Sequence, residues 1–379
     1  LIVDPEAGFK FSLTSDKKFV IVHYHIMFST YTGEPLYFKM INSDLNVVES
    51  KRFEFPYIKS KLKLINYERG ESGNYYFAIQ TEPTKGKKSR RGGRAARISY
   101  NYSILVYNAK KDSLQDYKIS VKKFNPSSLM MTISENEDVL AFGFGTRRSS
   151  SAYSGVYFQR IDPRTEKFIV KNFLDFSKDR TFLAEFKQER NGTNESQWYS
   201  FTPGQVVQRD NGGFVYLTEQ CYTEKEVIRD PKTKKETSAY FHHYNDILAI
   251  SVDDENNMEW FRRIPKNQYS TNDKGYYSSF TVKPVMNKLK ILYNDHSKNL
   301  KNKNLEKIKE LRNNIATNPS GQAIVATVYS DGNIDKAIMF EGSDSKYTIC
   351  PKLFIDSDPQ FFIYAQKGSK FKIGNFFFE

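Results

Sequence analysis

The sequence has 379 residues, of which 39% are hydrophobic and 15% aromatic, including 30 Phe and 25 Tyr. This length suffices for one large domain or two of medium size, and it excludes a disulfide-dense miniprotein. With only 20 Gly and 13 Pro, a disordered or collagen-like chain is excluded as well. The formal net charge of +13 favours an acidic partner, which includes nucleic acid, anionic lipid, acidic glycan and acidic protein.

The apolar runs do not predict a membrane span, and the cysteines do not predict a metal site. No apolar run approaches the roughly 20 residues that cross a bilayer, so no transmembrane segment is predicted. Cys221 and Cys350 form no metal-spaced cluster, and a disulfide would require the fold to bring them together. We expect two independent buried thiols.

A unit made of a short strand, a polar turn and a mostly apolar strand recurs along the chain. The copies span residues 11–24, 62–80, 129–144, 206–218, 280–293 and 354–364. Their second strands are predicted to begin near residues 19, 75, 139, 214, 288 and 361. After the last copy, only residues 370–378 remain for a further strand.

A second unit, an apolar strand followed by an Asx-rich turn and another strand, lies between the copies. It covers residues 36–49, 104–119, 156–170, 248–261 and 326–339. Together the two units predict four antiparallel strands, repeated six times. The predicted fold is therefore all-β, a six-bladed β-propeller of four-stranded antiparallel blades in a single domain, residues 1–379. A two-sheet sandwich and a pair of smaller β domains are the alternatives.

One helical insertion is predicted near residues 303–316. Leu305, Ile308, Leu311 and Ile315 recur at helical spacing, and Pro319 follows shortly after. The helix is interpreted as packing on the rim of the propeller, and an amphipathic helix that faces a partner or a membrane is the alternative.

In four-stranded blades, the loops between the second and third strands lie on one face of the ring, and here these loops are expanded and basic. Residues 82–97 carry a net charge of +6, and residues 224–236 are predicted to be another such loop. The loop at 82–97 has little to bury, so we expect it to be exposed and dispensable for folding. The predicted partner-binding residues are Lys85, Lys87, Lys88, Arg90, Arg91, Arg94, Arg97, Arg147, Arg148, Lys301 and Lys303. Solubility, or flexible insertions that bind no ligand, is the alternative explanation of their charge.

Motifs for common cofactors and metals are missing from the sequence. There is no Walker-type phosphate loop, no paired-histidine zinc motif and no calcium loop. Gly143 and Gly145 resemble part of a dinucleotide fingerprint, but they lie in a predicted strand with no helix after it. Residues 330–332 resemble part of a sialidase Asp box, but Ile334 stands where an aromatic residue is required, so the segment is interpreted as a hairpin turn.

The histidines suggest no metal site either. His23 and His25 share one face of a predicted strand, whereas the adjacent His242 and His243 project to opposite faces. A metal site needs a third ligand, which the sequence does not identify. We interpret these histidines as packed or surface residues, and we predict no catalytic residue, no cofactor and no metal.

One segment carries a resemblance to known proteins. Its features are Asn245-Asp246, Asp253-Asp254, Trp260, Ile264-Pro265-Lys266, Gln268, Asn272-Asp273 and Ser278-Ser279. With these features, residues 245–283, about a tenth of the chain, resemble a segment of large uncharacterised extracytoplasmic β proteins of the Bacteroidota. The resemblance implies a periplasmic or outer-membrane-associated location, and association with outer-membrane machinery such as the type 9 secretion translocon.

Three classes of function follow, in order of preference. The first is a non-catalytic scaffold whose basic loop face docks onto an acidic protein surface in an outer-membrane or periplasmic complex. The second is a carbohydrate-active or other enzyme that uses the axial pocket of the propeller. The third is non-specific nucleic-acid binding, which is less favoured because residues 85–97 contain no aromatic side chain for stacking on bases.

Overall fold

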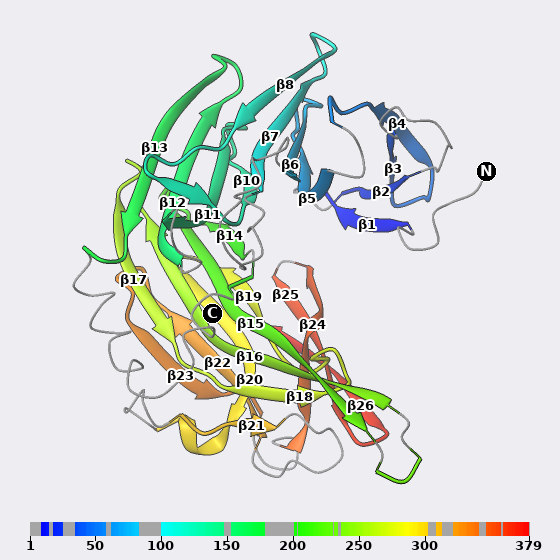
Figure 1. Ribbon diagram of the computed structural model, residues 1–379, viewed down its shortest axis with the longest axis vertical. Helices are drawn as coiled ribbons and strands as arrows, with labels where there is room; N and C mark the ends of the chain where they lie inside the picture. Colours follow the sequence, from blue (N-terminus) through cyan, green and yellow to red (C-terminus); the bar gives the residue numbers. More distant parts are fainter. Residues whose placement is uncertain are drawn as a thin grey trace. The chain divides into compact units, whose positions relative to one another are not determined.

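The computed structural model describes the greater part of the chain (Figure 1). The described residues are 9–14, 18–25, 35–57, 62–82, 100–147, 153–178, 201–202, 204–229, 231–233, 236–301, 308–312, 321–340, 346–357 and 359–378. They divide into two compact units, Leu1–Asp175 and Phe176–Glu379. Each unit is built from sheets that follow one another along the sequence and are antiparallel except for one short parallel pair in unit 2.

Unit 1 contains three sheets (Figure 1). The first has the order β1 (Lys10–Leu13), β2 (Val20–His25), β3 (Leu36–Ile41), β4 (Val47–Phe53). The second has the order β5 (Leu62–Arg69), β6 (Tyr75–Thr81), β7 (Asn101–Asn108), β8 (Ser113–Lys118). The third has the order β10 (Met130–Ile133), β11 (Val139–Arg147), β12 (Tyr153–Asp162), β13 (Lys167–Asp175), and β9 (Phe124–Pro126) also pairs with β11.

Unit 2 also contains three sheets (Figure 1). The first comprises β14 (Gln205–Gln208), β15 (Phe214–Arg229), β16 (Glu236–Val252), β17 (Met258–Ile264), β18 (Gln268–Thr271) and β21 (Leu311–Arg312). The second has the order β19 (Phe280–Val285), β20 (Lys288–His296), β22 (Gly321–Val328), β23 (Ile334–Ile338). The third comprises β24 (Thr348–Ser357), β25 (Gln360–Lys367) and β26 (Lys370–Phe377).

The core of each unit lies between the broad faces of successive sheets. In unit 1, Tyr76 and Ala78 of the second sheet pack with Val139 and Ala141 of the third, all fully buried. In unit 2, Leu217 and Ile291 belong to one buried cluster that joins the first and second sheets. Because both faces of the middle strands are covered, these strands are continuously apolar instead of alternating.

The fold confirms the predicted all-β class and the strand pattern. The second strands β2, β6, β11, β15, β20 and β25 begin at residues 20, 75, 139, 214, 288 and 360, within one residue of the predicted starts. The described residues form six sheets, and the last of them has three strands in the order β24, β25, β26. The closure of these sheets into one six-bladed, single-domain ring stays a prediction.

Two sequence-based expectations differ from the structure. Leu311 and Arg312, expected within the helical insertion, form the short strand β21, which pairs in parallel with β18. The amide of Leu311 donates to the carbonyl of Asn267 at 2.8 Å, and the Leu311 side chain is buried, so tertiary pairing overrides the helical spacing. Leu305 and Ile315 lie outside the described residues. The helical content of the described part is confined to 3₁₀ turns such as η3 (Ser297–Asn299), and no helix there could cross a membrane.

The second difference is an extended hairpin. Residues 224–229, predicted to start a basic loop, continue β15, which then spans 16 residues against the 17 of β16 (Figure 1). Pairing runs without interruption from Cys221 opposite Tyr244 to Arg229 opposite Glu236. This part of the hairpin, together with β18 and β21, forms a small sheet that carries the candidate site.

Candidate functional site

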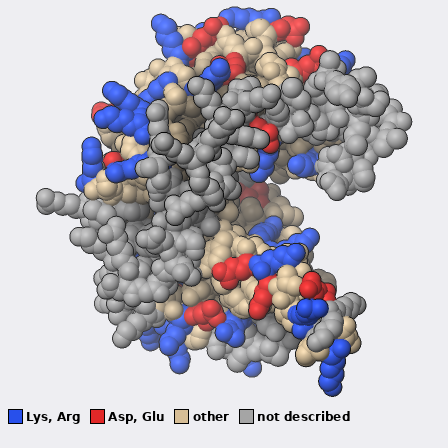
Figure 2. Space-filling view, viewed as in Figure 1, with Lys and Arg blue, Asp and Glu red and all other residues tan. Residues whose placement is uncertain are grey.

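Most of the predicted partner-binding cations lie outside the described residues. The structure describes Arg147, which forms an ion pair with Asp175 at 3.6 Å, and the exposed Lys301. The other predicted residues, which lie in 85–97, at 148 and at 303, are not described. Figure 2 shows Lys and Arg interspersed with Asp and Glu over the described residues of its visible face. The docking residues predicted from sequence therefore stay a prediction.

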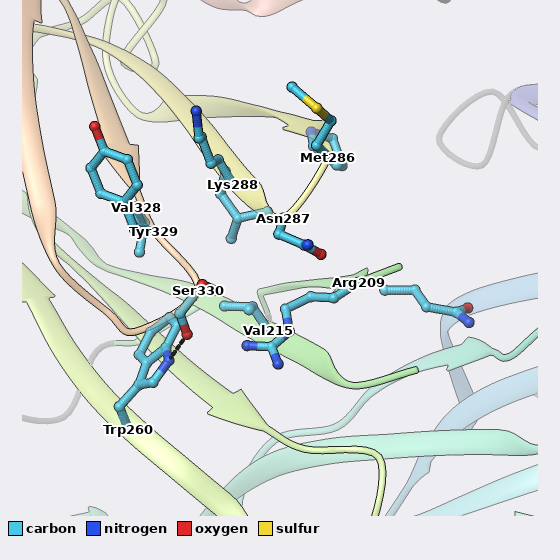
Figure 3. A pocket seen from close by; sticks show the side chains of 12 residues that line it. Arg209, Val215, Trp260, Met286, Asn287, Lys288, Val328, Tyr329 and Ser330 are labelled. Atoms are coloured by element: carbon cyan, nitrogen blue, oxygen red, sulfur yellow. Dashed lines mark hydrogen bonds between the residues drawn. The ribbon is translucent and has the colours of Figure 1, made fainter. Parts of the chain in front are cut away.

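A small hollow lies at the turns of the first two sheets of unit 2 (Figure 3). Its free volume is about 10 Å³, room for one water at most. Trp260 donates from Nε1 to the Ser330 carbonyl at 2.7 Å (Figure 3). Arg209 donates from Nη1 to Ser251 Oγ at 2.9 Å. The hollow is a packed junction of turns and too small for a substrate.

The segment that resembled an Asp box is a hairpin turn, as predicted. The amide of Tyr329 donates to the carbonyl of Asn333 at 2.9 Å, which closes the turn between β22 and β23. Gly332 has φ of +81°, and a Cβ there would lie 2.9 Å from the Trp260 ring. The turn therefore fixes the packing of Trp260.

The register of the extended hairpin sorts its side chains onto two faces. Residues directly opposite each other in antiparallel strands share a face, and neighbours in sequence alternate. Tyr222 pairs with His243, and His243 pairs with Tyr269 of β18. Tyr269 in turn neighbours Arg312 of β21. We call this side, with Glu224 and Phe241, the aromatic face: Tyr222, Glu224, Phe241, His243, Tyr269 and Arg312.

Ring contacts tie the aromatic face together. The His243 imidazole stacks on Tyr222 with a centroid distance of 4.5 Å and an interplanar angle of 10°. Its other neighbour, Tyr269, meets it edge to face at 5.1 Å. The Arg312 guanidinium lies 5.7 Å from the centroid of Tyr269, a cation–π distance. Four strands thus present one continuous row of rings that ends in a cation.

A carboxylate reaches this row from β15. Glu224 Oε2 lies 3.4 Å from His243 Nε2, and the Glu224 side chain is 62% exposed against 17% for His243. At the other end, Arg312 Nε donates to Glu310 Oε1 at 2.9 Å. An imidazole is a side chain that can accept or donate a proton in general acid–base catalysis.

The opposite side of the same strands is anchored by a buried polar network. Lys266 forms an ion pair with Glu219, and its ammonium also donates to Gln268 Oε1 at 3.1 Å and to the Tyr244 carbonyl at 3.0 Å. Ser279 Oγ donates to Glu219 Oε2 at 2.6 Å. Since every charge here has several partners, the network fixes the strands that carry the aromatic face.

Both cysteines are free, as expected from their spacing. Cys221 is half-buried and shares a strand pair with Tyr244, whereas Cys350 on β24 is fully buried. Burial, followed by the nearby Glu219 carboxylate, raises the pKa of Cys221 to about 11. Burial raises the pKa of Cys350 to about 12. Neither thiol is activated as a nucleophile.

The sequence predicted the opposite projection of the two adjacent histidines but not the site. His242 lies on the other face, where Nδ1 is 3.0 Å from Thr223 Oγ1, and it is buried. In segments 222–224 and 241–243, every second residue belongs to the aromatic face, and this alternation is the sequence signal that could have indicated the site. That signal can be interpreted only once the strands are known to continue through a stretch that composition assigns to a loop. Among the described residues, no group of His, Cys, Asp and Glu is arranged to hold a metal ion.

Comparisons with known proteins find similar solved structures at low sequence identity. No family model and no curated protein matches the chain. The polysaccharide lyase Uly1 is similar with a TM-score of 0.42 at 9% identity, over 97% of this chain and 77% of that one. A putative exo-β-1,3-galactanase from Bifidobacterium bifidum s17 has a TM-score of 0.37 at 9% identity, over 89% and 92% of the two chains. The β-propeller domain of the trilobed protease from Pyrococcus furiosus has a TM-score of 0.31 at 11% identity, over 97% and 94%.

These comparisons contradict the leading functional expectation. Uly1 and the galactanase are carbohydrate-active enzymes by name, and we withdraw the prediction of a non-catalytic docking scaffold. The expectation that the chain is not an enzyme is withdrawn with it. Identities of 9–11% do not transfer an activity, so the chemistry must come from the residues themselves.

Proposed function

We propose that this protein is an enzyme that acts on an acidic polysaccharide at the aromatic face of unit 2. The observation that carries the proposal is the placement of His243 between Tyr222 and Tyr269 with the Glu224 carboxylate at 3.4 Å. Stacked rings alone would make a binding surface. The imidazole and carboxylate add a group that can move a proton.

Each part of the aromatic face suits one part of such a substrate. Half-buried rings offer apolar surface to the faces of sugar rings, and their hydroxyl groups can hydrogen-bond sugar hydroxyls. Arg312, with a side chain 77% exposed, can bind a uronate carboxylate through two parallel N–H donors. His243 is the group that accepts or donates a proton, and Glu224 orients it. The site proposed here lies on the extended hairpin, whereas the sequence-based alternative placed the site of an enzyme in the axial pocket.

The proposal is tested by incubating the full chain with acidic and neutral polysaccharides and measuring new reducing ends. Ultraviolet absorbance of an unsaturated product distinguishes elimination from hydrolysis. Replacing the proton-transfer group by His243→Ala should lower kcat/KM by about 100-fold or more. Arg312→Ala should raise KM by about tenfold for acidic substrates and leave it unchanged for neutral ones.

The opposite face of the same hairpin provides a matched control. Lys225 and Tyr240 form an exposed pair there, with Nζ 5.8 Å from the ring centroid. Tyr240→Ala removes an aromatic ring from the same two strands and should leave kcat/KM within about twofold. Equal losses in His243→Ala and Tyr240→Ala, or no cleavage of any acidic polysaccharide, would show that the aromatic face is not an active site.

We also propose the wider context that the sequence suggested. The six sheets would be the blades of one propeller, residues 1–379, in an extracytoplasmic protein of the Bacteroidota, periplasmic or outer-membrane-associated. The segment 245–283 supports this location, where acidic polysaccharides of the surroundings are accessible. Fractionation of the native host with antibodies against the chain tests the location, and the proposal fails if the protein is found only in the cytoplasm.

A further inference from the structure

A second open cavity, in unit 1, lies where turns of the second and third sheets meet. It has a volume of about 380 Å³, within the range of small-ligand sites. The turns at Gly70–Asn74 and at 108–112 come from the second sheet, and those at 134–138 and 162–166 from the third. We name it the turn cleft, and its polar lining includes Asn74, Tyr76, Asn108, Lys110, Glu135 and Arg164.

One side of the turn cleft is held in place by Glu137. Its carboxylate accepts from the Ser72 amide at 2.7 Å and from the Tyr76 hydroxyl at 2.7 Å, which joins the two sheets. Gly70 makes this approach possible, because a Cβ there would lie 2.4 Å from the Glu137 carboxyl carbon. Burial by itself raises the pKa of Glu137, but these hydrogen bonds outweigh it and the pKa is lowered. The wall of the cleft is therefore preorganised and charged at neutral pH.

Other polar groups also line the turn cleft. The side-chain oxygen of Asn108 accepts from the amides of Lys110 and Lys111, both at 3.0 Å, so its amide nitrogen is left as a donor. Arg164 is fixed by Asp162 at 2.8 Å and by Asp138 at 2.9 Å, yet its side chain is 65% exposed. Lys110 adds an exposed ammonium, and Glu135 adds an exposed carboxylate acceptor.

We propose that the turn cleft is a saccharide-binding site for one or two sugar rings, separate from the aromatic face. Sugar hydroxyls both donate and accept hydrogen bonds, which matches a lining of amides, carboxylates and cations on two rigid sheets. The two cations lie on turns of different sheets and favour a sugar that bears a carboxylate, which Lys110 and Arg164 can bind. This inference does not depend on the proposed activity.

The test measures binding of glucuronic acid, galacturonic acid, glucose and galactose to the full chain by ligand-observed NMR and calorimetry. Uronic acids should bind at millimolar concentration and more tightly than the neutral sugars. Lys110→Ala should weaken uronate binding by about tenfold. Lys111→Ala is the matched control, since Lys111 lies in the same turn, pairs with Glu166 at 3.3 Å and does not line the cleft.

Three results would overturn the proposal: no binding of any of the four sugars, equal affinity in the wild type and Lys110→Ala, or equal weakening by Lys110→Ala and Lys111→Ala. The His243→Ala variant separates this proposal from the proposed function. It should lose cleavage of polysaccharide and keep monosaccharide binding at the turn cleft. Loss of binding in that variant would place the bound sugar at the aromatic face and contradict the turn cleft as a site.

Discussion

Lys266 and Glu219 form an ion pair that is closed off from solvent, with the two side chains 0% and 5% exposed. Removing the ammonium leaves a buried carboxylate whose remaining partner is Ser279. Lys266→Met should therefore lower the free energy of unfolding by about 3–5 kcal/mol. The measurement is urea denaturation followed by circular dichroism.

Two further variants make that prediction specific. The double variant Lys266→Met with Glu219→Gln removes the uncompensated charge and should recover part of the loss. Lys225→Ala, a lysine on the exposed part of the hairpin, should change stability by no more than about 0.5 kcal/mol. If Lys266→Met lowers the free energy of unfolding by less than about 1 kcal/mol, the Lys266–Glu219 ion pair does not stabilise these strands.

Glu68 makes the stability of unit 1 depend on pH. Burial raises the pKa of its carboxyl to about 7, although the Ile133 amide, at 3.3 Å from Oε2, favours the charged form. With the pKa raised on folding, the native state binds more protons than the unfolded state between about pH 4.5 and 7. The stabilisation that results from this raised pKa is therefore fully present below this pH window. It is lost from the free energy of unfolding as the pH rises through the window.

Glu68→Gln should remove this dependence. Relative to the wild type, the variant should gain about 1–3 kcal/mol in unfolding free energy between pH 5 and pH 8. Denaturation curves of both proteins at the two pH values measure the gain. If the difference in unfolding free energy between the variant and the wild type is the same at pH 5 and pH 8, the Glu68 carboxyl is ionised at both pH values.

Alanine substitutions at Gly332 and Gly368 distinguish the cost of a steric clash from the cost of backbone strain. Both glycines have positive φ, +81° and +58°, but a Cβ at Gly332 would meet the Trp260 ring at 2.9 Å, whereas nothing lies within 4 Å of one at Gly368. Gly368→Ala should lower the free energy of unfolding by about 1 kcal/mol, because alanine is strained in this backbone conformation. Gly332→Ala should cost at least about 1 kcal/mol more, because the ring must move. Thermal denaturation of both variants checks the difference, and equal costs would count against the clash.

The two thiols should react slowly in the native protein. Since burial raises the pKa values of Cys221 and Cys350 to about 11 and about 12, little thiolate is present at pH 8. Labelling by a thiol-specific disulfide reagent should be about 100-fold or more slower than in denaturant. Rapid labelling of Cys350→Ser, which keeps only Cys221, would show that Cys221 is reactive in the folded state.

The sequence by itself determined the strand pattern of this protein. Runs such as 75–79 and 214–217 are apolar at successive positions, and Asx-rich turns separate them, so both the strand order and the starts of the second strands follow from local composition. Local composition is sufficient here because turn residues and buried strands have strong preferences of their own.

Only the tertiary structure decided where the candidate site lies. Residues 224–229 are polar and charged, which predicts a loop, yet pairing with β16 continues the strand and brings Glu224 to His243. Leu311 belongs to a series of apolar residues at helical spacing, which predicts a helix. Pairing with β18 instead places Leu311 in a strand and brings Arg312 beside Tyr269. Both outcomes depend on hydrogen bonds and ring contacts between segments far apart in the chain, which local preference does not encode.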